Sequence, residues 1–129
     1  MIVCMYTDRL KEREDMVSGK FGEYLKSLIE KEQITKQDFY NKVGIGKPYF
    51  YEILSGKVCP PPPEVQMRMT DALRSASAEE KTKLLDLASV ERDEIPADIA
   101  RLIKNNPSDL NAVRKILNAL LVSRTIKLN

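Results

Sequence analysis

The sequence predicts an all-α protein, and three observations lead to that prediction. Apolar residues recur at spacings of three and four through most of the 129 residues, which is the period of an amphipathic helix. Residues typical of helix ends, chiefly Ser, Thr and Gly, separate these segments. The one tract of biased composition is a proline run at 60–63, which interrupts the helical pattern.

The first 19 residues differ in pattern from the first predicted helix. Residues 1–19 form an N-terminal arm whose short apolar start is compatible with either a strand or a frayed helical turn. From Lys20 to about Gln33 the apolar residues recur at helical spacing, with Lys and Glu between them. This pattern predicts an amphipathic helix. Its apolar face comprises Phe21, Leu25, Leu28 and Ile29.

A short second helix is predicted between Thr35 and Gly44. Thr35 is a typical N-cap residue, and Asp38 falls in the first turn, where the helix dipole favours an acid. Phe39 and Val43 are four residues apart and therefore share a face. We expect the helix to stop at Gly44, since glycine readily adopts the left-handed conformation that ends many helices.

Pro48 opens a third short helix. Lys47 precedes a proline and is therefore disfavoured from helical backbone angles, so either Gly46 or Lys47 is the cap. Pro48 then falls in the first turn, where its missing N–H is no loss. The helix is expected to end at residues 55–56. Its inward stripe comprises Phe50, Ile53 and Leu54.

The prolines at 60–63 predict a stiff, extended connector without backbone N–H donors. A fourth helix follows the connector. Its apolar residues are Val65, Met69, Ala72, Leu73 and Ala76.

Three further helices are predicted towards the C-terminus. Ser77 and Glu80 form a capping box that begins the fifth helix, Pro96 opens the sixth, and Ser108 caps the seventh. The fifth carries Leu84, Leu87 and Ala88, and the sixth carries Ile99, Leu102 and Ile103. The apolar stripe of the seventh comprises Leu110, Val113, Ile116, Leu117, Leu120 and Leu121.

Charge is unevenly distributed along the chain, although the net charge is only +2. Acids outnumber bases in residues 64–100, whereas residues 101–129 hold six Lys and Arg against one acid, Asp109. Residues 35–59 carry four lysines and two acids. The net charge alone does not indicate a nucleic-acid partner, but two basic regions flank an acidic one.

Several function classes lack support in the composition. Histidine is absent, which removes the commonest general base and metal ligand. Two cysteines do not make a zinc site, and neither a Walker phosphate loop nor a dinucleotide-binding fingerprint is present. We therefore expect no enzymatic activity, no cofactor and no metal.

The sequence predicts a cytoplasmic protein. Its start lacks the long apolar stretch of a secretory signal, and its apolar runs are far shorter than the ~20 residues that span a bilayer. No membrane partner is therefore expected. Cys4 and Cys59 are far apart in sequence, which favours two reduced thiols.

Two short helices around a glycine turn, with amphipathic helices before and after them, are the parts of a helix-turn-helix module. The stretch ITKQDFYNKVGIGKPYFYEILSGK resembles the XRE-type helix-turn-helix of phage-repressor-like bacterial regulators. The resemblance covers residues 20–92 and implies a lambda-repressor-like all-α bundle, followed by a C-terminal helical extension over residues 93–129. The matching turn, core and closing positions are Gly44, Ile45, Phe50, Ile53, Gly56 and Lys57.

The chain departs from the family pattern at three places. Tyr40 stands where the family usually has a small residue, so either the two helices cross more widely or the tyrosine points outward. Leu54 replaces a frequent acid, and residues 46–48 replace a more polar opening of the recognition helix.

The resemblance implies contacts with double-stranded DNA. Residues expected at or near base edges are Lys47, Pro48, Tyr49, Tyr51 and Glu52, and those expected near phosphates are Lys36, Ser55 and Lys57. Lysine can contact guanine or phosphate, a carboxylate can accept from cytosine, and tyrosine or proline carbons can pack on a thymine methyl. The tyrosines could equally be half-buried surface aromatics. Lys57 could equally satisfy carbonyls at a helix end.

The apolar stripe of the last predicted helix is compatible with more than one function. As a dimer seam, its stripe fits a sequence-specific transcriptional regulator that acts as a homodimeric repressor, because one reading helix covers too few base pairs. The resemblance further implies a prophage or mobile-element setting. Packing on the chain's own core is the alternative for this stripe. A second function is a protein-interaction module, such as an antitoxin whose C-terminal helices hold a partner protein. A third is a small enzyme that uses carboxylates.

Overall fold

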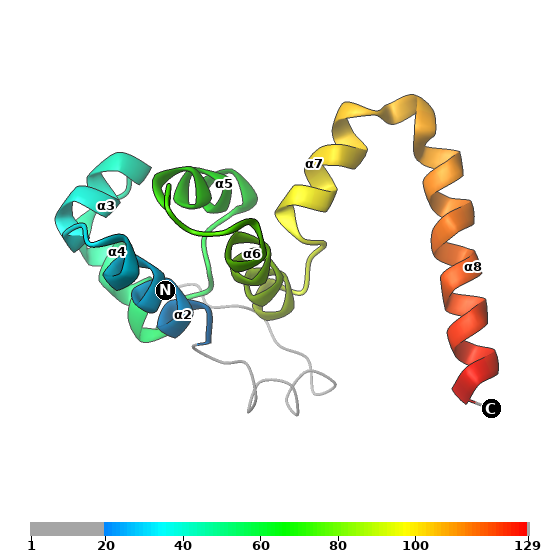
Figure 1. The fold of residues 1–129 in the computed structure, drawn as a ribbon, viewed down its shortest axis with the longest axis horizontal. Coiled ribbons are helices and arrows are strands. Elements are labelled where there is room, and N and C mark those ends of the chain that lie inside the picture. The colour runs from blue at the N-terminus through cyan, green and yellow to red at the C-terminus, as the bar shows by residue number, and fades with distance from the viewer. Residues whose placement is uncertain (1–19, 129) are drawn as a thin grey trace. The chain divides into compact units, whose positions relative to one another are not determined.

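A computed structural model describes the backbone of residues 20–128 and the side chains through Leu120. In this part of the chain every regular element is helical, which confirms the predicted all-α class (Figure 1). The specific helix-turn-helix arrangement stays a prediction, and the arm at 1–19 lies outside the described residues. The elements are α2 (Lys20–Glu32), α3 (Lys36–Val43), α4 (Lys47–Ser55), α5 (Pro63–Ala72), α6 (Ala78–Arg92), α7 (Ala97–Asn105), the 3-10 turn η1 (Pro107–Asp109) and α8 (Leu110–Leu128).

The chain divides into two compact units, residues 1–98 and residues 99–129. The first unit contains the hydrophobic core. In it, α2 packs against α4 and α6, and α3 packs against α4 and α5. The buried core residues are Phe21, Leu25, Leu28, Ile29, Phe39, Val43, Phe50, Ile53, Met69, Ala72, Leu73, Leu84 and Ala88.

The caps that begin helices follow the local sequence. Thr35 accepts a hydrogen bond of 3.0 Å from the backbone N–H of Asp38. Ser77 and Glu80 exchange two hydrogen bonds, of 2.9 Å and 3.0 Å, and form the predicted capping box. Gly46 is the N-cap of α4, which decides between the two residues that the sequence allowed.

Two predicted details of the later helices are wrong. Ala76 lies beyond α5, because that helix ends at Ala72 with Leu73 as its C-cap. Ser108 lies inside the 3-10 turn instead of capping α8, because the turn after Asn106 delays the helix to Leu110.

Gly22 lets α2 approach the C-terminal end of α4. A Cβ atom at this position would lie 2.5 Å from the carbonyl oxygens of both Ile53 and Leu54. Backbone atoms cannot move aside as a flexible side chain can, so only glycine permits this spacing. The close approach fixes the C-terminal end of α4 against α2.

Candidate nucleic-acid interface

The turn between α3 and α4 is short and well held. Gly44 has φ 86°, in the left-handed region, and ends α3 as predicted. The N–H groups of Gly44 and Ile45 both donate to the carbonyl of Tyr40, at 2.9 Å and 3.1 Å. The Arg68 guanidinium donates to the carbonyl of Val43 from α5, at 2.8 Å. These bonds close the C-terminal end of α3 and join it to α5, and so hold the turn that leads into α4.

The two sides of α4 have opposite environments. Its inner side places Phe50 and Ile53 in the core. Its outer side and leading end are exposed, and so is the residue after its glycine cap. The exposed residues are Lys47, Pro48, Tyr51, Ser55 and Lys57. Every one of them belongs to the set that the sequence predicted to contact DNA.

Phe50 is the centre of an aromatic cluster that supports α4. The ring of Tyr40 lies 5.3 Å from that of Phe50, and Phe39 lies 5.8 Å from it, both tilted. Tyr40 is half-buried, so this large residue packs on the core side of the turn instead of pointing fully into solvent. Tyr51 contacts Phe50 edge-on at 5.3 Å and keeps 43% of its surface exposed.

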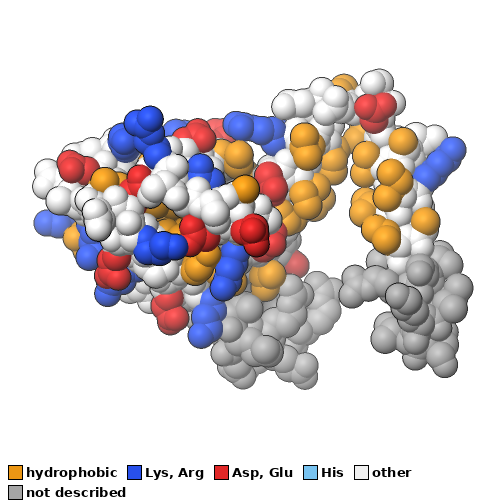
Figure 2. Space-filling model, viewed as in Figure 1, with side chains coloured by type: hydrophobic (Ala, Val, Ile, Leu, Met, Phe, Trp, Pro, Cys, Tyr) orange, Lys and Arg blue, Asp and Glu red, His pale blue; other side chains and the backbone are white. Residues whose placement is uncertain are grey.

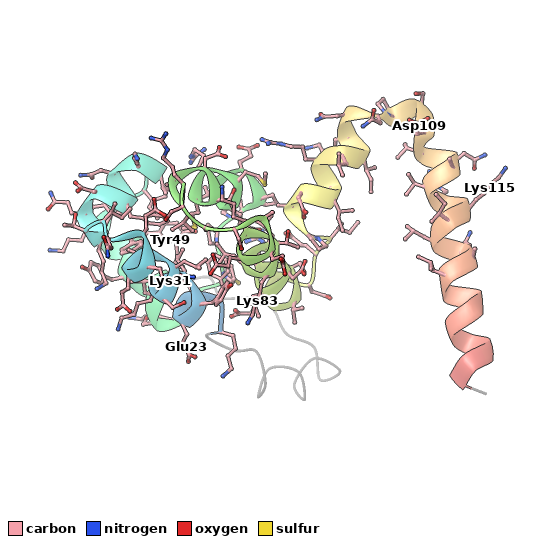
Figure 3. All side chains as sticks on the ribbon, in the orientation of Figure 1. Glu23, Lys31, Tyr49, Lys83, Asp109 and Lys115 are labelled. Atoms are coloured by element: carbon pink, nitrogen blue, oxygen red, sulfur yellow. The ribbon has the colours of Figure 1, made fainter. Side chains whose placement is uncertain are left out.

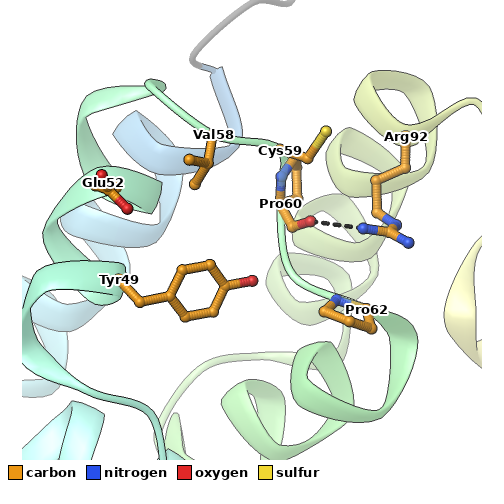
Figure 4. Close-up of a pocket in the computed structure, with 7 residues that line it drawn as sticks. All are labelled: Tyr49, Glu52, Val58, Cys59, Pro60, Pro62 and Arg92. Atoms are coloured by element: carbon orange, nitrogen blue, oxygen red, sulfur yellow. Dashed lines mark hydrogen bonds between the residues drawn. The ribbon is translucent and has the colours of Figure 1, made fainter. Parts of the chain in front are cut away.

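Tyr49 and Glu52 face a groove of about 530 Å³ between α4, the proline connector and α6, called here the connector groove. Figure 4 shows the Tyr49 ring reaching from α4 toward the connector. Burial raises the pKa of the Tyr49 hydroxyl, against the opposing effect of Arg92. Both residues are half-buried, so they are less open than Lys47 or Tyr51. The remaining lining residues are Val58, Cys59, Pro60, Pro62 and Arg92.

Arg92 holds the connector in place. Its guanidinium donates to the carbonyl of Pro60 at 2.9 Å (Figure 4). The same guanidinium donates two further hydrogen bonds, of 2.8 Å and 3.1 Å, to the Glu94 carboxylate. Cys59 is disulfide-bonded, so the prediction of a reduced thiol at this position is wrong. Cys4 lies outside the described residues.

The other predicted phosphate contacts lie at helix ends. Lys36 is the first residue of α3 and is half-exposed. Ser55 donates its hydroxyl to the Glu52 carbonyl at 3.1 Å. The backbone N–H of Lys57 also donates to that carbonyl, at 3.0 Å. The backbone, not the lysine side chain, therefore satisfies the Glu52 carbonyl.

Sequence reasoning missed a second basic feature. Lys42, Arg68 and Arg74 line a depression of about 390 Å³ together with Asp71, between α3 and α5. Lys42 was counted only as one of the lysines between 35 and 59. Lys42 is distant in sequence from Arg68 and Arg74, and the α3–α5 packing that brings it to them has no local signal.

The C-terminal stripe is open to solvent where its side chains are described. Ile116, Leu117 and Leu120 are exposed, and Leu110 and Val113 are half-buried. The side chain of Leu121 lies outside the described residues. Within residues 99–129, none of the described stripe side chains is buried in a core.

Comparison with known protein families, characterised proteins and solved structures finds no match to this chain. Among the described residues, no helix is both long enough and apolar enough to span a membrane.

Proposed function

We propose that this chain is a sequence-specific DNA-binding transcriptional regulator, and that it acts in the cytoplasm as a homodimeric repressor. The observation that carries the proposal is the environment of α4. Its inner side is fixed in the core by Phe50 and Ile53, while Lys47, Pro48 and Tyr51 project from the exposed side. A rigid helix with exposed side chains at its leading end suits entry into the major groove.

The chemistry of the exposed side fits both parts of DNA recognition. Lys47 reaches a guanine edge or a phosphate, and the carbon atoms of Pro48 and Tyr51 pack on a thymine methyl. The first turn of α4 also leaves backbone N–H groups without helical partners, which suits a phosphate oxygen. Lys36 and Lys57, at other helix ends, add cations for the DNA backbone.

We expect Tyr49 and Glu52 to contribute less to DNA binding than the exposed residues of α4. Because both line the connector groove, they meet the duplex at the edge of the interface. A carboxylate near phosphates costs affinity unless it meets a cytosine amine or a cation. Glu52 therefore contributes to discrimination between bases more than to affinity.

A homodimer is proposed because one helix of this length reads too few base pairs for useful specificity. The exposed stripe of α8 supplies a surface for it. Repression of a prophage or mobile-element promoter follows from the resemblance to phage-repressor-like regulators.

Selection of bound sequences from a random duplex pool tests the proposal first. A palindromic site with half-sites about one helical turn apart supports it. The selected duplex then serves in fluorescence titrations at several salt concentrations. Failure to select any sequence, or selection without a salt-dependent affinity, overturns the proposal.

The lysine pair gives the sharper test. Lys47→Ala with Lys57→Ala should weaken binding and reduce the slope of log affinity against log salt by about two. Lys26→Ala with Lys81→Ala makes the same change of charge away from α4 and should leave both quantities near the wild-type values. If the two double variants have the same affinity and the same salt slope, α4 does not contact the DNA.

A second function is favoured by one observation, the exposed stripe of α8. Such a surface also suits an antitoxin-like module that holds a partner protein. In that case purification from the native host yields a stoichiometric partner, which is lost when residues 108–129 are removed. No palindromic DNA site is then selected.

A further inference from the structure

The connector groove has the size and lining of a small-molecule site. Its volume of about 530 Å³ falls within the range of roughly 300–1,000 Å³ that ligand pockets occupy. Its walls are mostly apolar, with Val58, Pro60 and Pro62 around the ring of Tyr49 (Figure 4). Figure 3 shows Tyr49 on the side of α4 that faces the rest of the first unit. The groove therefore offers an apolar surface to a ligand, with few polar groups to fix its orientation.

The wall of the groove is held by hydrogen bonds from two helices. Arg92 of α6 donates to the Pro60 carbonyl, and the buried Gln66 of α5 donates its side-chain N–H to the Pro61 carbonyl at 2.8 Å. The proline rings further restrict the backbone of the connector. On the opposite wall, Phe50 fixes α4 in the core. A ligand thus meets a surface that is already formed, and it loses little affinity to ordering that surface.

The charge that a ligand meets in the groove is set by the residues next to it. Figure 2 shows acidic and basic side chains interspersed over one face of the first unit, so distant charges largely cancel. Within the groove, the Arg92 guanidinium is neutralised by the Glu94 carboxylate, which accepts two of its hydrogen bonds. Its third hydrogen bond goes to the Pro60 carbonyl. Arg92 is therefore already engaged.

Glu52 is the acid of the groove, and its charge is not matched in this way. It lies three residues after Tyr49, on the same face of α4, and is half-buried. Among the described residues, no ion pair joins Glu52 to a lysine or arginine, and its carboxylate takes part in no hydrogen bond. The unmatched charge that faces the groove is therefore negative.

We propose that the connector groove binds a small organic cation of the arylalkylamine type, whose ring packs between Tyr49 and the prolines while its ammonium group pairs with Glu52. An aliphatic amine is protonated at neutral pH, as the amine of lysine is. Burial raises the pKa of the Tyr49 hydroxyl, so this group stays neutral and can accept a hydrogen bond from the same ammonium group.

Other classes of ligand fit the groove less well. An anion would be repelled by Glu52, and the guanidinium of Arg92 is already paired with Glu94. A metal ion would lack ligands, because the described part of the chain contains no cluster of three or more suitable side chains. Cys59 is disulfide-bonded, so it does not serve as a nucleophile toward a covalent ligand.

A bound cation changes how α4 meets DNA. This effect rests on the proposed function, whereas the binding of the amine does not. Glu52 lies at the edge of the proposed interface, where a negative charge near phosphates lowers affinity. An ammonium group paired with Glu52 cancels that charge, so the amine should strengthen DNA binding about fivefold. DNA should strengthen binding of the amine by the same factor.

Nuclear magnetic resonance titration of the full chain with phenethylamine tests the site. The backbone amide of Val58 should shift in a saturable way, with a dissociation constant on the order of 1 mM. Phenethyl alcohol and phenylacetate carry the same ring but are neutral and anionic. We expect the alcohol to bind about threefold more weakly than the amine, and phenylacetate more weakly still, because only the amine pairs with Glu52.

Glu52→Gln removes the negative charge and keeps the size of the side chain. This variant should bind phenethylamine no more tightly than it binds phenethyl alcohol. Glu30→Gln makes the same change on the exposed surface of α2 and should keep the preference for the amine. Circular dichroism confirms that both variants are folded.

The outcomes separate this inference from the proposed function. The absence of a saturable shift with phenethylamine overturns the inference, as do equal affinities for the amine and the alcohol, or a preference for the amine that Glu52→Gln retains. A chain that binds the amine but selects no duplex refutes only the proposed function. A DNA affinity that rises with phenethylamine in the wild type, but not in Glu52→Gln, supports both.

Discussion

The backbone N–H of Phe21 donates a hydrogen bond of 2.9 Å to a carboxylate oxygen of Glu91, a residue 70 positions away whose side chain is only 5% exposed. The first N–H groups of a helix have no partner within it, so the α6 carboxylate serves as a distant cap for α2. A negative charge at this end is also favoured by the helix dipole. The contact fixes α2, which in turn supports α4.

Removal of this carboxylate should destabilise the first unit. Glu91→Ala leaves a buried N–H unsatisfied and should lower the free energy of unfolding by about 2 kcal/mol. Glu91→Gln keeps an acceptor oxygen, so its free energy of unfolding should fall by less. Urea denaturation followed by circular dichroism measures the effect. Glu30→Ala is the control, since Glu30 is exposed near the C-terminal end of α2; an equal loss there would contradict the capping role.

The close approach of α2 to α4 predicts that replacing Gly22 by alanine destabilises the protein more than the same replacement at Gly46. Gly22→Ala forces a Cβ against two carbonyl oxygens and should cost about 1–3 kcal/mol, while displacing α4 enough to weaken binding of the selected duplex. Gly46→Ala makes the same chemical change where the added Cβ would meet only the Pro48 ring, at 3.8 Å. The free energy of unfolding of that variant should fall by about 1 kcal/mol or less. Thermal unfolding compares the two, and a Gly22→Ala protein as stable as Gly46→Ala refutes the close contact.

The cap of α3 offers a test of local structure. Thr35→Ala removes the hydrogen bond to Asp38 and should destabilise the protein by about 1 kcal/mol. Thr82→Ala is the matched control, because Thr82 is exposed within α6, where alanine is a better helix former. Chemical denaturation should show a loss for the first variant and none for the second. A loss of similar size in both would mean that the cap contributes nothing specific.

The stability of the protein should depend on pH through Glu32. Hydrogen bonds from the hydroxyl and the backbone N–H of Ser75 lower the pKa of the Glu32 carboxyl below its ordinary value of 4.5. A group with a lowered folded pKa stabilises the protein fully above its unfolded pKa, and this stabilisation is lost as pH falls through the folded pKa. Ser75→Ala should therefore lower stability at pH 7 and make no difference at a pH below both values.

Denaturation midpoints measured from pH 7 down to pH 3 check that expectation. Ser27→Ala is the control, because the Ser27 hydroxyl bonds only to the carbonyl of Tyr24 in its own helix. Its effect should be the same at every pH. A Ser75→Ala deficit that persists unchanged at low pH would show that the hydroxyl acts through packing instead of through the carboxylate.

The features that the sequence predicted correctly are local ones. Thr35, Gly44 and the capping box at Ser77 each act within a few residues, so the residue types alone reveal them. The exposure of Lys47 and Tyr51 also followed from the period of a short helix whose inner positions are Phe50 and Ile53.

The features that sequence reasoning missed depend on contacts between distant segments. Glu91 appeared only as one acid in an acidic region, although the structure buries it at the start of α2. The inward direction of Tyr49 depends on where the connector passes α4, and that path is set by Arg92 on α6. Helical periodicity contains no information about such pairings, because it describes one helix at a time.

The four consecutive prolines of the connector affect how the protein can be observed. Because proline has no amide hydrogen, residues 60–63 give no signal in amide-detected magnetic resonance or hydrogen-exchange experiments. Two carbonyls of this segment nevertheless accept from side-chain N–H groups, Pro60 from Arg92 and Pro61 from Gln66. The guanidinium and carboxamide resonances of those two residues are therefore the spectroscopic probes through which a change in the segment beside α4 can be followed.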